Sequence, residues 1–167
     1  MKILLTLLLS FWCSVQVMAY DINKLRTDFE EATKKENACK NLIQTLNQNK
    51  YTSQALYFGY LGSANVMMAI YVTNPLTKYN YFQKGKNQLE KAISMDKNNV
   101  ELLYLRFAIQ TNVPSFLNYN HQIGNDRKVL VAYYPLLKDE ELKRNIVRVF
   151  KKYSGTTASE KRVLNIQ

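Results

Sequence analysis

The amino-acid sequence predicts an all-α protein, a compact antiparallel domain of about seven helices. Two observations carry this prediction. Apolar residues recur at spacings of three and four along nearly the whole chain after residue 20, which is the period of amphipathic helices. No segment sustains the apolar–polar alternation of a strand, and no Asn-Gly dipeptide marks a hairpin.

The longer predicted helices lie in the first two thirds of the chain. They cover residues 22–32, 37–46, 54–71, 77–95 and 99–110. Asn37, Ser53 and Thr77 are the expected N-caps of the second, third and fourth helices. Asn98 followed three residues later by Glu101 is a capping-box pattern for the fifth. The third helix is apolar on nearly all sides, so we expect it at the centre of the domain.

Shorter helices are expected in the last third of the chain. Residues 115–119 and 126–134 show helical spacing, and Pro135 ends the second of these segments. Asp139 opens the last predicted helix, which carries apolar residues on one side. Residues 154–167 lack a periodic pattern, so we expect a mobile tail after a helical domain of residues 20–153.

Residues 1–19 resemble a secretory signal peptide. Lys2 provides a positive start, and the apolar run that follows ends in Val17-Met18-Ala19, with a small residue at the expected cut. The alternative, an uncleaved anchor, needs about 20 apolar residues, whereas this run ends at Ser14. The pattern predicts cleavage near Ala19 and export to the periplasm or beyond the cell.

Cleavage would leave one cysteine and a basic chain. Cys39 then has no internal disulfide partner, and its place on an apolar helix face predicts a buried small hydrophobe. Without Lys2 the chain carries 22 basic and 13 acidic side chains, a net charge of about +9. After export this charge would meet anionic envelope surfaces, not nucleic acid. Because the cations are scattered, the simpler interpretation is a basic, solvated surface.

The segment LEKAISMDKNNVELLY resembles the junction between two tetratricopeptide repeats. The residues that match the family's second helix and turn are Gly85, Leu89, Ala92, Asp96, Asn98 and Asn99. Gly62 matches the glycine of the repeat's first helix, but it precedes Gly85 by 23 residues instead of about twelve. Lys97 stands where the family usually has proline. The resemblance therefore implies one degenerate helix pair within a closed helical domain, and it names no ligand.

A longer run, residues 74–119, is similar to a family of uncharacterised small exported proteins of Gram-negative bacteria. The likeness extends over most of the chain after residue 20. It implies export and supplies no activity.

The residue inventory offers little for catalysis. His121 is the only histidine, and nothing in the sequence associates it with Cys39 as a nucleophile and base. There is no cluster of metal ligands and no Gly-rich phosphate loop. We therefore expect no enzyme activity, no cofactor and no metal. Three groups of acidic residues leave a cell-wall hydrolase as a remote alternative, because glycosidases need two carboxylates. They are Asp28, Glu30 and Glu31, then Glu90 with Asp96, and Asp139 to Glu141.

Arg106 is the main candidate binding residue, because apolar neighbours surround it in the fifth predicted helix. A buried guanidinium needs a partner. Arg106 therefore either pairs with a carboxylate or with helix-end carbonyls and fixes helix packing, or it lines a polar recess for an anionic or peptide ligand with Gln110, Asn112 and Tyr119. Tyr57 and Tyr60 share the third helix. They serve either core packing or an interface, because tyrosine combines apolar area with a hydroxyl group.

These observations predict an exported, non-catalytic helical domain that binds a protein or peptide partner. The alternative is an electrostatic binder of anionic envelope lipid or glycan. Salt dependence separates the two, because screening weakens exposed charge interactions. The sequence leaves the oligomeric state open.

Overall fold

The computed structural model describes residues 20–167, and in that range the protein is all-helical, as predicted. The signal-peptide prediction falls on residues 1–19, outside the described part. The described residues form nine α-helices and two 3-10 turns: α1 Ile22–Ala32, α2 Glu36–Leu46, α3 Asn49–Thr52, α4 Ala55–Tyr71, α5 Pro75–Met95, α6 Val100–Gln110, η1 Ser115–Leu117, α7 Ile123–Tyr133, η2 Tyr134–Leu136, α8 Glu140–Lys152 and α9 Ala158–Val163.

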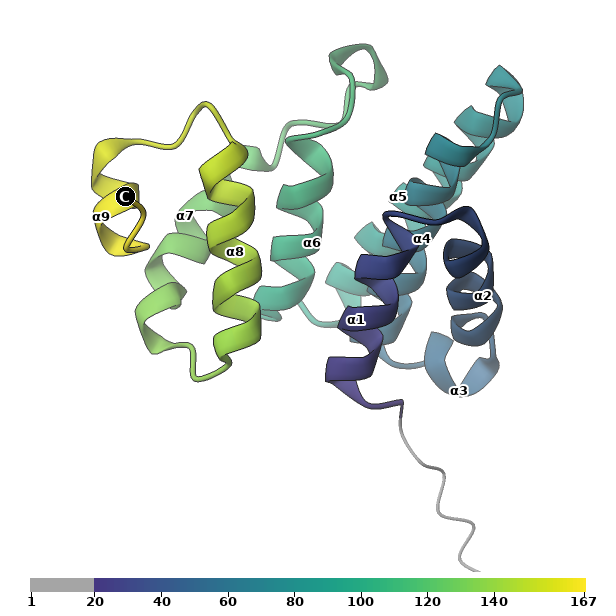
Figure 1. The fold of residues 1–167 in the computed structure, drawn as a ribbon, viewed down its shortest axis with the longest axis horizontal. Helices are drawn as coiled ribbons and strands as arrows, with labels where there is room; N and C mark the ends of the chain where they lie inside the picture. Colours follow the sequence, from purple (N-terminus) through teal and green to yellow (C-terminus); the bar gives the residue numbers. More distant parts are fainter. Residues whose placement is uncertain (1–19) are drawn as a thin grey trace, which may run out of the picture.

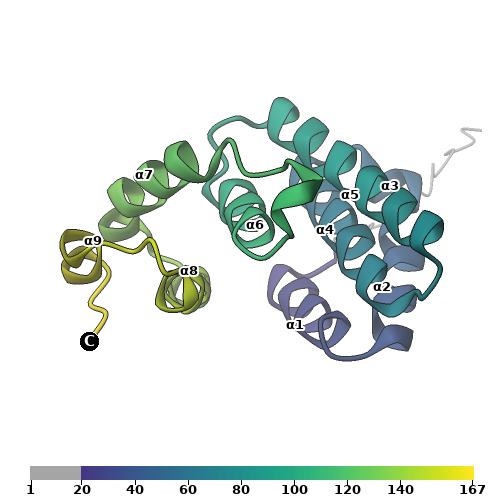
Figure 2. The ribbon, with the colours of Figure 1, turned by 90° about the horizontal axis from the view of Figure 1, so that it is seen from above.

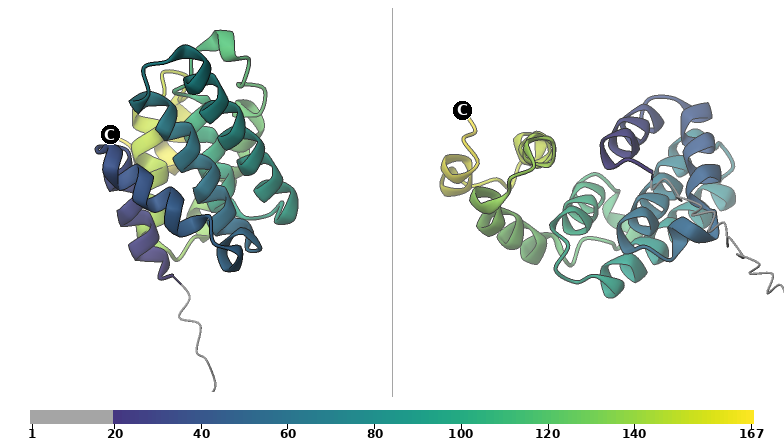
Figure 3. Two further views of the ribbon diagram at one scale, coloured as in Figure 1. Left: turned by 90° about the vertical axis from the view of Figure 1, so that its right-hand side faces the viewer. Right: turned by 90° about the horizontal axis from the view of Figure 1, so that it is seen from below.

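The helices follow a curve (Figures 1 and 2). Helices α2 to α5 form one end, α6 lies in the middle, and α7 to α9 form the other end. In the right-hand view of Figure 3, α1 and α8 both lie on the inner side of this curve. The curved order places α6 between the two ends, where it can pack against both.

Helix α4 forms the centre of the first of two apolar cores. Ten of its residues are buried, in keeping with its apolar sequence. It packs along α5, and the two backbones approach closely where Gly62 faces Gly85. A Cβ atom on Gly62 would lie 2.7 Å from both the Gly85 carbonyl oxygen and the Leu89 amide nitrogen, so neither helix has room for a side chain there.

The second core joins α6, α7, α8 and the C-terminal segment. Its buried side chains are Phe107, Leu130, Leu142, Ile146, Phe150 and Leu164. Phe107 stacks against Phe150 with ring centroids 4.8 Å apart. Since α6 also contributes Leu102 and Leu105 to the first core, this helix belongs to both.

Four predicted N-caps are wrong. Asn37 lies inside α2, and Ser53 ends α3 instead of capping α4. Thr77 does not cap α5. Asn74 is the cap, and its side chain accepts from the Thr77 amide. Pro75 occupies the first turn, where the fixed φ angle of proline fits the helix.

The capping box expected at α6 does not form. Asn99, not Asn98, accepts from the amides of Glu101 and Leu102. Glu101 cannot turn back toward the helix start because its carboxylate is buried and paired with Arg26. Asp139, in contrast, caps α8 as predicted, and its side chain accepts from the Leu142 amide at 2.9 Å.

The predicted unpatterned tail is also wrong, because residues 158–163 form α9. Thr157 and Glu160 form a capping box at its start. Arg127 of α7 anchors this segment through an ion pair to Glu160 at 2.9 Å and a hydrogen bond to the Gly155 carbonyl at 3.0 Å. Leu164 is 1% exposed and completes the second core.

Candidate functional site

Arg106 is buried, and carboxylates occupy its whole guanidinium group. Nε and Nη2 donate to the two carboxylate oxygens of Asp126 in α7, at 2.8 and 2.7 Å. Nη1 donates to Glu90 of α5 at 2.8 Å, and the Tyr119 hydroxyl donates to the other oxygen of Glu90 at 2.5 Å. Of the two interpretations of Arg106, pairing with a carboxylate is therefore confirmed.

The electrostatics of this Arg106 network (Arg106, Asp126, Glu90 and Tyr119) favour a fixed structure. Burial lowers the pKa of Arg106, but the hydrogen bonds and charges of Asp126 and Glu90 outweigh burial and the net pKa is raised. Burial raises the pKa of Asp126, and Arg106 opposes that shift only in part. Burial and the hydrogen bond to Glu90 raise the pKa of Tyr119. The network fastens α5, α6 and α7 together.

Gln110 and Asn112 do not join this network. Gln110 is 2% exposed and lies one turn after Arg106 on α6. Asn112 is exposed, and its side-chain amide donates to the Ala108 carbonyl at 2.8 Å. Within residues 20–167 no hydrogen bond connects either side chain to Arg106 or Tyr119. Only two of the four residues expected to line a recess therefore meet, and they meet through Glu90.

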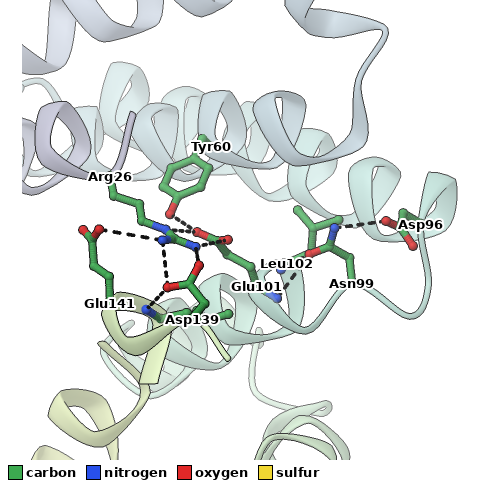
Figure 4. A network of polar contacts seen from close by, with 9 residues as sticks. Arg26, Tyr60, Asp96, Asn99, Glu101, Leu102, Asp139 and Glu141 are labelled. Carbon is green, nitrogen blue, oxygen red and sulfur yellow. Dashed lines mark hydrogen bonds and ion pairs between the residues drawn. The ribbon is translucent and has the colours of Figure 1, made fainter. Parts of the chain in front are cut away.

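A second buried arginine, Arg26 of α1, was not predicted (Figure 4). Its Nε and Nη2 donate to the two oxygens of Glu101 in α6, both at 2.7 Å. Nη1 and Nη2 donate to Asp139 at 3.1 and 2.8 Å, and Glu141 lies 3.7 Å from Nη1. The Tyr60 hydroxyl donates to Glu101 at 2.6 Å. This Arg26 network connects α1, α4, α6 and the start of α8.

The sequence carried a signal for Arg26. It lies four residues after Ile22 and three before Phe29, so it interrupts the apolar face of the first helix. Arg106 shows the same feature, a charged residue among apolar neighbours in a predicted helix. The two candidate tyrosines pack α4 onto this region: Tyr60 is buried, and the Tyr57 hydroxyl donates to the Tyr20 carbonyl at 2.6 Å.

Cys39 and His121 lie in different environments. Cys39 is fully buried, and its thiol donates to the Ala64 carbonyl at 3.3 Å. Burial raises the pKa of this thiol to about 11, which disfavours the nucleophilic thiolate. His121 is exposed beside the Tyr119 ring. Across residues 20–167 no group of three or more His, Cys, Asp or Glu side chains could hold a metal ion.

None of the helices formed by residues 20–167 is both long and apolar enough to cross a bilayer.

The open surface with the most distinctive chemistry lies along α8. This helix is strongly amphipathic: Leu142, Ile146 and Phe150 are buried on one side. A second face carries Glu140, Lys143, Arg144, Val147, Arg148 and Lys151, which recur at spacings of three and four. This face lines a groove of about 470 Å³.

The C-terminal segment helps to form this α8 groove. Leu164 and Asn165 line it together with Tyr134 of η2. The Thr157–Glu160 capping box and the Arg127 contacts hold that segment in place. The groove thus depends on residues 154–167, a segment whose sequence shows no apolar periodicity.

The groove is predominantly positive. Lys143 pairs with Glu140 at 2.9 Å, so these two charges offset each other. Arg148 lies 3.9 Å from Glu30, and both side chains are more than half exposed. No ion pair within residues 20–167 involves Arg144 or Lys151. Three cations with weak or no partners therefore border the apolar Val147 and Leu164.

A second, smaller groove has the opposite character. It lies between α1 and α2, has a volume of about 250 Å³, and includes Asp28 and Glu31 in its lining. Asp28 accepts hydrogen bonds from Tyr20 and Lys24. Lys34 and Lys35 both pair with Glu31. Its carboxylates thus already have partners.

Comparison of the chain with protein-family models, curated proteins and solved structures finds no match.

Proposed function

We propose that the protein is a non-catalytic binding domain whose partner is a protein or peptide. The observation that carries this proposal is the α8 groove, in which exposed cations border apolar side chains from α8, η2 and the C-terminal segment. Protein interfaces combine such an apolar centre with a polar, solvated rim.

The carboxylates considered for hydrolysis already serve other roles. Glu90 accepts from Arg106 and Tyr119, and Asp139 accepts from Arg26 and caps α8. Asp28 accepts from Lys24. A structural use of each group supports a binding function over a glycosidase mechanism, which needs one carboxylic acid and one carboxylate facing the substrate.

Export is part of the proposal. The charged start, the short apolar run and Ala19 support removal of residues 1–19 and delivery to the periplasm or the exterior. Mass spectrometry of the protein purified from its native cell gives the mature N-terminus directly. We expect a chain that begins near Tyr20, and a retained Met1 contradicts the proposal.

Selection from a displayed random-peptide library tests partner binding to residues 20–167. We expect selected peptides to keep measurable binding in about 0.5 M salt, because salt weakens the exposed charge contacts but does not screen the apolar ones. Val147→Asn should weaken their binding at least about tenfold, since it makes the apolar centre polar. Val163→Asn is the matched control, because Val163 is 41% exposed on α9 and does not line the groove.

The outcomes separate the two candidate functions. Peptides that bind the Val147→Asn variant as tightly as the unchanged protein, or a library that yields no binder, contradict the peptide-binding proposal. The positive charge of the groove favours the second candidate, an electrostatic binder of anionic envelope lipid or glycan. Binding to phosphatidylglycerol vesicles that disappears in about 0.5 M salt would support that candidate.

A further inference from the structure

We propose that the α8 groove recognises an acidic peptide segment, in which two or three carboxylates adjoin a large apolar side chain. This inference rests on the proposed binding function and specifies the chemistry of the partner. It follows from the spacing of the cations, their incomplete pairing and the apolar residues beside them.

The cations form a ladder along α8. Arg144, Arg148 and Lys151 are four and three residues apart, so their Cα atoms are separated by about 4.5–6 Å along the helix axis. Alternate residues of an extended peptide are about 6.6 Å apart. The long arginine and lysine side chains absorb this small difference, so an extended segment with carboxylates at alternate positions matches the ladder.

Ordinary helix stabilisation explains only part of this ladder. Lys151 and Lys152 lie in the last turn of α8, where a cation interacts favourably with the helix dipole. Arg144 lies in the second turn and Arg148 in the middle, where this effect is weak. The 3.9 Å pair between Arg148 and Glu30 is exposed, and such pairs contribute little. The positive charge is therefore available to a ligand.

The lining of the groove favours a peptide over a membrane surface. The cations line one wall of a depression of about 470 Å³, Tyr134 contributes half-buried apolar lining from η2, and the buried Leu164 lies beneath it. A lipid surface would engage a broad outward face, including Lys152, which does not line the groove. A peptide can place carboxylates against the cations of α8 and an apolar side chain against the half-buried Val147 and Tyr134.

Fluorescence anisotropy with three labelled peptides tests the inference on residues 20–167. The acidic probe is Gly-Glu-Leu-Glu-Leu-Glu-Gly, and its two controls replace every glutamate by glutamine or by lysine. We expect the acidic probe to bind at least about tenfold more tightly than the glutamine peptide, because a charged partner strengthens each contact with Arg144 and Lys151. The lysine peptide should not bind.

Charge-reversal variants locate the binding on the protein. Arg144→Glu and Lys151→Glu should each weaken binding of the acidic probe about tenfold or more. Lys152→Glu is the matched control, since it reverses the same charge on the neighbouring residue outside the groove, and it should change affinity less than about twofold. The double variant Arg144→Glu/Lys151→Glu should instead bind the lysine peptide. Circular dichroism checks that each variant keeps its helices.

The results distinguish failure of this inference from failure of the proposed function. Equal binding of the glutamate and glutamine peptides overturns the acidic specificity and leaves a peptide-binding groove. Binding that Lys152→Glu weakens as much as Lys151→Glu also overturns it. If none of the three peptides binds and the random library yields no binder, both proposals fall. In a further outcome, the acidic probe fails to bind while phosphatidylglycerol vesicles bind through Arg144 and Lys151. That outcome overturns the acidic-peptide inference and supports the lipid-binding candidate.

Discussion

Arg26 and Arg106 each donate to carboxylates with all three guanidinium nitrogens, but the elements that they connect lie at different distances along the chain. Arg26 reaches Glu101 and Asp139, which are 75 and 113 positions away. Arg106 reaches Glu90 and Asp126, which are only 16 and 20 positions away. Both networks join elements of the two apolar cores, but the Arg26 network does so between segments far apart in the chain, whereas the Arg106 network fastens the successive helices α5, α6 and α7.

This difference shows that similar buried ion pairs can stabilise different contacts, either between neighbouring helices or between segments far apart in the chain. Helix α6 supplies Glu101 to one network and Arg106 to the other. Arg26 also joins α1 to the start of α8, because it forms ion pairs with Asp139 and Glu141. We therefore expect damage to the Arg26 network to release α1 and the start of α8 from α6, and damage to the Arg106 network to loosen α5, α6 and α7.

The largest effect should come from Glu101→Gln. This carboxylate accepts from Arg26 and Tyr60, and its removal leaves a buried guanidinium with only the more exposed Asp139 and Glu141. We expect a loss of roughly 3–5 kcal/mol in the free energy of unfolding. Chemical denaturation followed by circular dichroism measures the loss. The dependence on denaturant should also become shallower if α1 and the start of α8 are released from α6.

Asp126→Ala should cost about 3 kcal/mol, toward the lower end of the range for a broken buried pair, because it removes both oxygens that accept from Arg106. It removes the bidentate partner of Arg106 but leaves Glu90 in place. The steepness of the unfolding curve should stay unchanged. Hydrogen exchange should accelerate in α6 and α7 and not in α1. Faster exchange across α1 would contradict the local role of this network.

A smaller effect is expected for Asp139→Asn, about 0.5–1 kcal/mol. The Asp139 side chain is 42% exposed, so solvent screens its attraction to Arg26. Asparagine can still cap α8. Asp139→Ala is the informative comparison, because it also removes the cap and should cost about 1 kcal/mol more. Equal thermal midpoints for the two variants would show that the cap contributes nothing.

The smallest effect is in the pH dependence, where the two networks should differ in sign. Burial raises the pKa of Asp139, but hydrogen bonds from Arg26 and the Leu142 amide outweigh burial and the net pKa is lowered. Its stabilisation is therefore complete above the unfolded pKa of about 3.9 and is lost as the pH falls through the folded pKa. Asp126 has a raised pKa, so its contribution becomes more favourable as the pH falls from the folded pKa toward about 3.9.

Unfolding midpoints between about pH 3 and pH 7 test this difference. Asp139→Asn should make the stability loss at low pH shallower, while Asp126→Asn should make it steeper. Variants that change the slope in the same direction would refute the contrast between the networks.

Much of the fold could be predicted from local patterns. The three-four spacing gives the long helices, and the nearly all-apolar segment gives the central helix α4. Arg106 stands out because a charge on an apolar helix must be paired. Gly62 and Gly85 meet at the close approach of α4 and α5, although membership of the repeat family that they resemble stays a prediction. The Thr157–Glu160 pattern was also readable and would have predicted α9.

The sequence by itself determined the long helices and which of their faces are apolar, because side-chain period acts within a few residues. Only the tertiary structure decided that Arg26 pairs with Glu101 and that Leu164 packs beside α8 to form the groove. The physical reason is that each amphipathic face can be buried against several others. The choice depends on the packing and charge pairing of residues that lie far apart in the chain.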